Sequence, residues 1–170
     1  PSAGNAVRSG FGTLTATPAL KMWDGTGKTG TPVTFDIALT VERSGGTTMN
    51  LKDVVFNKPV TVACQGKPQN VTMSESNGSA EFRGGFTAGN VNCWNNLSLK
   101  CYAPVHVGTV NSGSGCSYAF QLYDGAQGST FSSYTVNYYG GLWCAAEDVM
   151  PHDLVMNFGL ASVGDGQGDV

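Results

Sequence analysis

The sequence predicts an all-β protein, a single domain built as an antiparallel β-sandwich or barrel and stapled by disulfides. Three observations lead to this prediction. Apolar and polar residues alternate with a period of two in many short segments, whereas helical periodicity is almost absent. Turn signals rich in Gly, Asn and Ser recur about every 8–12 residues between these segments. The chain also contains five cysteines, none in a CxxC pair, which indicates bridges between strands.

The clearest expected strand covers residues 31–42, where alternate apolar residues from Val33 to Val41 face one side and polar residues such as Asp36 face the other. Residues 145–150 are the only segment expected to form a helix, of one turn at most, and no internal repeat is evident. Shorter strands are expected at residues 11–17, 54–56, 60–64, 118–123, 134–139 and 154–160, and around Phe82, Phe86, Val91, Leu97 and Leu99.

With 170 residues, the chain is long enough to bury the core of one domain. We expect a flexible N-terminal segment at residues 1–10, the β-sandwich domain at residues 11–163 and a flexible Gly-rich tail at residues 164–170. The chain begins at Pro1 without Met and has no apolar run long enough to span a membrane. It is therefore interpreted as a mature fragment that does not cross a membrane.

The cysteines suggest two bridges and one remaining thiol. Cys116 and Cys144 flank a hairpin-like stretch and are the preferred pair. Cys64–Cys101 is favoured over Cys93–Cys101, which leaves Cys93 as the candidate free thiol, although spacing alone does not fix the connectivity. Disulfides persist in oxidising compartments. The protein is therefore expected to be secreted or exposed on a cell surface.

Several functional classes are disfavoured. The formal net charge is −3 and no basic stripe occurs, so nucleic-acid binding is not expected. The segment Gly25-Thr-Gly-Lys-Thr29 resembles a phosphate-binding loop. However, Met22 stands where that motif requires its first Gly, and a strand rather than a helix is expected to follow. An exposed loop is the preferred interpretation, and no cofactor is expected.

A small acidic and histidine cluster precedes the last expected strand. Asp148, His152 and Asp153 could ligate a metal or form an acid–base pair. A zinc site needs three or four ligands at defined spacing, and Pro151 indicates a simple turn here. We therefore expect neither a metal site nor a catalytic residue.

The tryptophans are the best candidates for ligand contact, because each lies beside or near Gly, Asn or Asp. Sugar-binding sites combine an aromatic platform with side chains that hydrogen-bond hydroxyl groups. The alternative is that Trp94 and Trp143, each next to a cysteine, pack in the core. The sequons at Asn70, Asn77 and Asn96 are candidate glycosylation sites. The candidate ligand-binding residues are Trp23, Asp24, Trp94, Asn95, Tyr123, Asp124 and Trp143.

Residues 35–60 (FDIALTVERSGGTTMNLKDVVFNKPV) resemble the β-domain of archaellin-like filament subunits, with a strand, a Ser/Gly turn and a Leu-Lys-Asp-Val-Val segment leading into the next strand. The Gly/Thr/Ser/Asn-rich composition with cysteines also resembles bacterial pilus subunits (pilins) and adhesins. Both resemblances imply an extracellular role in assembly or contact.

The leading functional hypothesis is a non-enzymatic pilus, filament or adhesin subunit that binds other protein subunits, a host or cell-surface receptor, or a glycan. It would assemble through the edge strands expected at residues 11–17 and 154–160. The alternative is a carbohydrate- or receptor-binding module that uses the tryptophans. A third hypothesis is a secreted hydrolase that uses His152 with Asp148 or Asp153.

Overall fold

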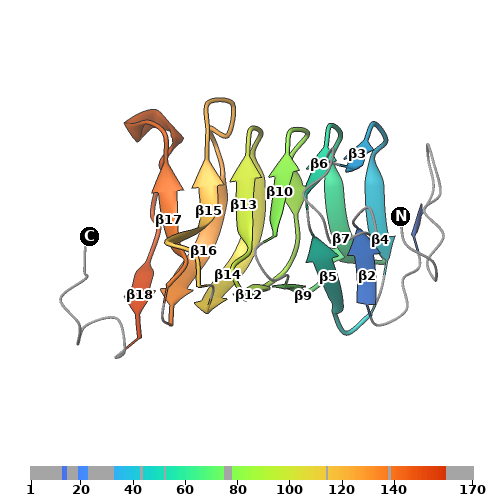
Figure 1. The fold of residues 1–170 in the computed structure, drawn as a ribbon, viewed down its shortest axis with the longest axis horizontal. Coiled ribbons are helices and arrows are strands. Elements are labelled where there is room, and N and C mark those ends of the chain that lie inside the picture. Colours follow the sequence, from blue (N-terminus) through green and yellow to red (C-terminus); the bar gives the residue numbers. More distant parts are fainter. Residues whose placement is uncertain are drawn as a thin grey trace.

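The computed structural model is a β-solenoid, whose coils follow one another from the N-terminal to the C-terminal end (Figure 1). Almost every strand pairs in parallel with the strand one coil later. The one antiparallel pair among the described strands joins β7 (Val60–Cys64) to β8 (Lys67–Pro68). The structure describes residues 13–14, 19–22, 33–42, 44–51, 53–74, 78–113, 115–137 and 139–159.

Three faces run along the solenoid. Face 1 contains β1 (Thr13–Leu14), β4 (Leu39–Glu42), β7, β11 (Phe86–Thr87) and the first parts of β14 (Val105–Gly113) and β16 (Thr130–Val136). Face 2 contains β2 (Ala19–Met22), β5 (Thr47–Leu51), β9 (Val71–Ser74), β12 (Val91–Trp94), the second parts of β14 and β16, and β18 (Met156–Phe158). Face 3 contains β3 (Val33–Phe35), β6 (Val54–Phe56), β10 (Ser79–Phe82), β13 (Ser98–Cys101), β15 (Tyr118–Leu122) and β17 (Gly141–Cys144). Because β14 and β16 continue past the corner between faces 1 and 2, these two faces form one 12-stranded sheet, and face 3 forms a separate six-stranded sheet.

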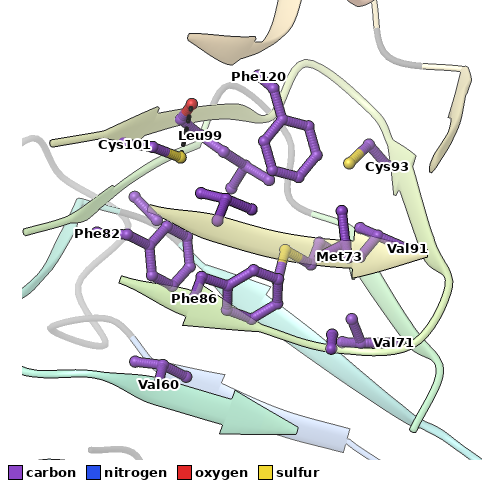
Figure 2. Close-up of a cluster of buried hydrophobic side chains, with 14 of the residues drawn as sticks. Val60, Val71, Met73, Phe82, Phe86, Val91, Cys93, Leu99, Cys101 and Phe120 are labelled. Carbon is purple, nitrogen blue, oxygen red and sulfur yellow. Dashed lines mark hydrogen bonds between the residues drawn. The ribbon is translucent and has the colours of Figure 1, made fainter. Parts of the chain in front are cut away.

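Adjacent coils pair in register, so equivalent residues stack into columns along the solenoid. In face 3, Phe35, Phe56 and Phe82 form one such column, with neighbouring ring centroids 5.5 Å and 5.2 Å apart. Figure 2 shows side chains from the three faces meeting in the interior, among them Val60 from face 1, Val91 from face 2 and Phe82 from face 3. Stacked coils therefore bury a continuous core that one coil could not bury alone.

Asparagine side chains fix the corner between faces 1 and 2. Asn70 Oδ1 accepts a hydrogen bond from the Asn90 N–H at 3.0 Å, and Asn90 Oδ1 accepts one from the Thr109 N–H at 2.9 Å. Side-chain amides thus satisfy backbone donors at the corner. Gly108 lies against this ladder, and a Cβ at Gly108 would be 2.8 Å from Asn90 Oδ1. A side chain at this position would therefore push Asn90 Oδ1 away from the Thr109 N–H.

The segment that follows β17 closes the C-terminal end of the solenoid. It contains the 3-10 turn η1 (Glu147–Val149), in agreement with the single turn expected at residues 145–150. Val149 is only 1% exposed, and Leu154 packs against the same core. The segment covers the interior as terminal capping elements do in solenoids. β18 follows it as the last described strand of face 2.

The chain is all-β, but the predicted antiparallel sandwich or barrel is wrong. The turn signals between strands mark corners of the solenoid rather than hairpins. Apart from β7 with β8, a strand pairs with its equivalent 19 to 29 residues later, and not with its immediate neighbour in sequence. Because the coils differ in length, their repetition does not produce a fixed sequence period.

Residues 31–42 do not form the single strand that their alternation predicts. They form two strands, β3 on face 3 and β4 on face 1, with residues 36–38 at the corner between them. Phe35, Leu39 and Val41 are nevertheless all buried. Alternation continues through the corner, so periodicity alone does not reveal where the first strand ends.

The predicted disulfides are also wrong, because the five cysteines form no bridge. Cys116 precedes the start of β15, whereas Cys144 pairs with Leu122 at the far end of that strand. The length of β15, about 13 Å, therefore separates the two thiols. Cys64 lies at the end of face 1 and Cys101 at the corner where the chain enters that face, so the width of the face separates them. The argument from disulfides for an extracellular location loses its basis.

The predicted domain boundaries fall in parts of the chain that the structure does not describe. Residues 1–10 and 164–170, both expected to be flexible, lie outside the described residues. The described residues of the β-domain share one core. None of the helical structure in the described ranges has the length and hydrophobicity that a membrane crossing requires.

We expect iodoacetamide to alkylate all five cysteines when the protein is unfolded in denaturant without reductant, because no pair is oxidised. In the folded protein, Cys93 and Cys101 should stay unmodified, since both are buried. Burial raises the pKa of the Cys93 thiol to about 12, so the reactive thiolate is scarce near neutral pH. Mass spectrometry of the intact protein and its peptides measures both results. Fewer than five labels in denaturant would contradict the structure.

Candidate functional site

The outer surface of face 2 presents a continuous column of uncharged polar side chains. Asn111 Nδ2 donates a hydrogen bond to Asn92 Oδ1 at 3.3 Å within this column. None of the described residues on face 2 from β5 to β18 is charged. We call this set the Thr/Asn column; its members, paired in register from coil to coil, are Thr48, Thr72, Asn92, Asn111, Thr135 and Asn157.

A shallow depression of about 370 Å³ opens at one end of the Thr/Asn column. Gly45 and Gly46 have φ angles of 80° and 93°, a backbone conformation that favours glycine. Because these two residues have no side chains, the depression is shallow where they line it. Its lining is mainly polar, contains no charged residue and comprises Gly45, Gly46, Thr47, Thr48, Asn70, Val71, Thr72 and Asn92.

Trp94 provides an aromatic surface beside the Thr/Asn column. It follows Asn92 by two residues on β12, so both side chains point outward. Trp94 pairs in register with Gly113 of the next coil, and a Cβ at Gly113 would overlap the six-membered ring of the indole. The indole therefore lies over the Gly113 backbone, while 42% of the residue stays exposed. Among the described residues, no aromatic ring stacks on Trp94.

Two further exposed aromatic residues lie at the corner between faces 2 and 3. Tyr118, 43% exposed, begins β15 and pairs in register with Gly141 of the next coil. Tyr139, 37% exposed, lies two residues before Gly141. The Tyr139 carbonyl accepts a hydrogen bond of 3.3 Å from Ser112 Oγ. These contacts tie both residues to the neighbouring coils.

Tyr134 anchors the backbone of this corner from the inside. Its hydroxyl donates to the Gly140 carbonyl at 2.8 Å and lies 3.1 Å from the Gly141 carbonyl. Burial raises the pKa of Tyr134 well above its ordinary value, so the hydroxyl stays protonated and able to donate. The backbone that presents Tyr139 is thereby connected to the core.

The structure divides the predicted ligand-binding residues between two corners. Trp94 and Asn95 lie together where face 2 turns into face 3. Tyr123 and Asp124 lie at the corner between faces 3 and 1, and Trp143 lies in β17 of face 3 near that corner. Trp23 and Asp24 lie outside the described residues. Tyr123 and Trp143 have ring centroids 5.1 Å apart, and Tyr102 stacks on Tyr123 at 4.6 Å. The faces of these rings are therefore partly occupied by one another.

The other candidates lie apart from face 2 or at its edge. His152 and Asp153 are exposed in the loop before β18, and Asp148 Oδ2 accepts a hydrogen bond of 3.2 Å from Gln127 Nε2. Within the described part of the chain, no three His, Cys, Asp or Glu residues are placed to hold a metal ion. Of the sequons, Asn70 is in the corner ladder, Asn96 is exposed near Trp94, and Asn77 lies outside the described residues.

Sequence reasoning missed every member of the Thr/Asn column. A signal was available, because Asn70-Val-Thr72, Asn90-Val-Asn92 and Thr109-Val-Asn111 repeat one pattern. In each, the first residue is at the corner, the valine is buried and the third residue faces outward. Recognition of this pattern would have indicated both the coil and its polar face.

Comparison with protein-family models, curated proteins and solved structures found no match for this chain. The resemblance of residues 35–60 to filament subunits stays a prediction. In the structure these residues run from β3 to β7 and pass through more than one coil.

We expect Gly113→Ala to displace the Trp94 indole, because the new methyl group would occupy the space of the ring. Because Trp94 is 42% exposed, the indole can move outward into solvent, so we expect its displacement and not unfolding of the protein. Gly141→Ala is the matched control, since its Cβ would meet no atom closer than 3.5 Å. Acrylamide quenching of tryptophan fluorescence measures the displacement. Equal quenching in both variants would contradict this placement of Trp94.

Proposed function

We propose that the protein is a non-enzymatic binding module that recognises neutral carbohydrate through the outer surface of face 2. A sugar offers hydroxyl groups, which both donate and accept hydrogen bonds, and apolar C–H faces. The Asn and Thr side chains of the Thr/Asn column also donate and accept. The indole of Trp94 is suited to an apolar sugar face. The two kinds of group lie side by side on one surface.

The position of Trp94 is the observation on which the proposal depends. Its indole packs over Gly113, yet 42% of the residue is exposed. Folding therefore leaves part of a large apolar surface in contact with water. Asn92 is on the same strand and the same side, about 7 Å away along the backbone. An aromatic anchor flanked by a few polar groups is typical of small-ligand sites.

The charge distribution favours a neutral ligand. The described part of face 2 from β5 onward has no charged residue, so nothing there would neutralise an acidic sugar. Face 3, in contrast, carries Glu81 beside its register partner Lys100, and Glu81 forms an ion pair of 2.7 Å with Arg83 at the following corner. A polysaccharide ligand would be met outside the cell or at its surface. The proposed extracellular location rests on this ligand class and not on disulfides.

We expect the protein to bind at least one neutral glycan on an array and Trp94→Ala to weaken that binding at least about tenfold, or ~1.4 kcal/mol. Trp143→Ala is the matched control, because it removes an indole from the opposite corner and should leave binding unchanged. Titration calorimetry of the hit measures the affinities. The proposal fails if no neutral glycan binds, or if Trp94→Ala binds as tightly as the unmodified protein.

A second candidate function is assembly with further copies of the chain through β18. This strand pairs only with β16 among the described strands. Val155 and Phe158 are 55% and 53% exposed at this end. An unpaired strand edge with apolar side chains can accept a strand from a neighbouring molecule. β18 lies within residues 154–160, where an assembly edge is predicted from the sequence. The described part of the other predicted edge is β1, which pairs with β4.

We expect Phe158→Lys to reduce concentration-dependent association, because a charge at the edge opposes strand addition. Ser132→Lys places the same charge on an exposed position of β16 away from this edge and serves as the control. Sedimentation velocity over a range of concentrations measures the effect. A monomer at every concentration, or an equal loss in both variants, would exclude assembly through β18.

A further inference from the structure

We infer that the ligand is an extended neutral polysaccharide chain that lies parallel to the solenoid axis, along the corner between faces 2 and 3, with successive sugar units contacting Trp94, Tyr118 and Tyr139. This inference rests on the proposed function and deepens it, because it specifies a polymer and its direction. It follows from the placement of three exposed aromatic residues and from the run of the polar column beside them.

The three aromatic residues occur in consecutive coils at the same corner. Trp94 ends β12 on the face 2 side, and Tyr118 begins β15 one coil later on the face 3 side. Tyr139 lies one coil further, just before Gly141, the register partner of Tyr118. Neighbouring coils are about 4.8 Å apart, so the three residues span roughly 10 Å along the axis. That length exceeds a single sugar ring.

Glycines of the following coil lie against two of these aromatic side chains, Trp94 and Tyr118. Trp94 lies over Gly113, and a Cβ at Gly141 would be 3.8 Å from Tyr118 Cδ1. In both cases the aromatic side chain extends along the axis towards the next coil. Both residues nevertheless stay more than 40% exposed and so accessible to a ligand that follows the axis.

The polar groups repeat in the same direction. The Thr/Asn column runs from β5 to β18, roughly 24 Å along the axis at the spacing of adjacent strands. Three of its members, Thr48, Thr72 and Asn92, also line the shallow depression at one end. A chain lying across the axis would meet one column member and one aromatic residue. A chain lying along the axis meets an equivalent group at every coil.

The experiment measures affinity against ligand length. Manno-, xylo-, cello- and laminari-oligosaccharides from the disaccharide to the hexasaccharide are titrated calorimetrically into the full chain. We expect the affinity for the best series to rise at least about tenfold from disaccharide to hexasaccharide. Tyr118→Ala and Tyr139→Ala should each remove most of this gain. Tyr118→Phe, which keeps the ring, should retain the gain.

Tyr123→Ala is the control, because it removes a tyrosine from the opposite corner. Equal affinity for short and long oligosaccharides would overturn the axial polymer while leaving carbohydrate binding intact. An undiminished length gain in both Tyr118→Ala and Tyr139→Ala would also overturn it. Absence of binding by every oligosaccharide would remove the proposed function and this inference together. Circular dichroism of each variant establishes that any loss comes from the surface and not from unfolding.

Discussion

Parallel backbone hydrogen bonds between successive coils, made in register, hold this structure together and determine where every side chain lies. A strand of one coil satisfies the N–H and C=O groups of the next, and side chains at equivalent positions are brought within about 5 Å of each other. Inside, this stacks Phe35, Phe56 and Phe82. Outside, it pairs Asn92 with Asn111. The core and the proposed binding surface are therefore two results of one pairing pattern.

The same constraint explains why small and amide residues occupy the corners. At the corner between faces 1 and 2 the partner of β14 changes from β11 to β12, and side chains satisfy some of the backbone donors there. Asn70 and Asn90 do this by accepting hydrogen bonds from the next coil. Gly108 and Gly113 give neighbouring side chains space against the backbone. At Gly113 that space is filled by Trp94, so a packing requirement also orients the side chain on which the proposed function depends.

Local patterns in the sequence predict the strands well and their arrangement poorly. Alternation correctly identifies buried positions such as Val60 and Phe82, since burial of alternate residues is a property of one strand. Whether the next strand returns as a hairpin or continues around a coil depends on the backbone geometry of the turn that joins the two strands. Gly and Asn are suited to both geometries.

The candidate site, like the fold, could be predicted from the sequence only in part. Trp94 and Asn95 are recognisable from sequence because they are adjacent. Asn92 and Asn111 become neighbours only when the coil length is known, so their roles depend on the register. The prediction of disulfides failed for a physical reason too. Cys93 and Cys101 are buried in the core, in positions that an aliphatic side chain could also fill. The sequence alone does not distinguish a buried thiol from a bridged one.

In-register stacking of coils is tested most directly by a short thiol cross-linker between paired positions. Thr61 and Thr87 pair across β7 and β11 on face 1, whereas Thr61 and Asn111 lie on different faces. Both double-cysteine variants are made with Cys64, Cys116 and Cys144 replaced by alanine. A dibromobimane, which becomes fluorescent when it bridges two thiols, should link positions 61 and 87 and leave positions 61 and 111 unlinked. Failure to link 61 and 87 when each thiol reacts singly, or equal linking of both pairs, would contradict the solenoid.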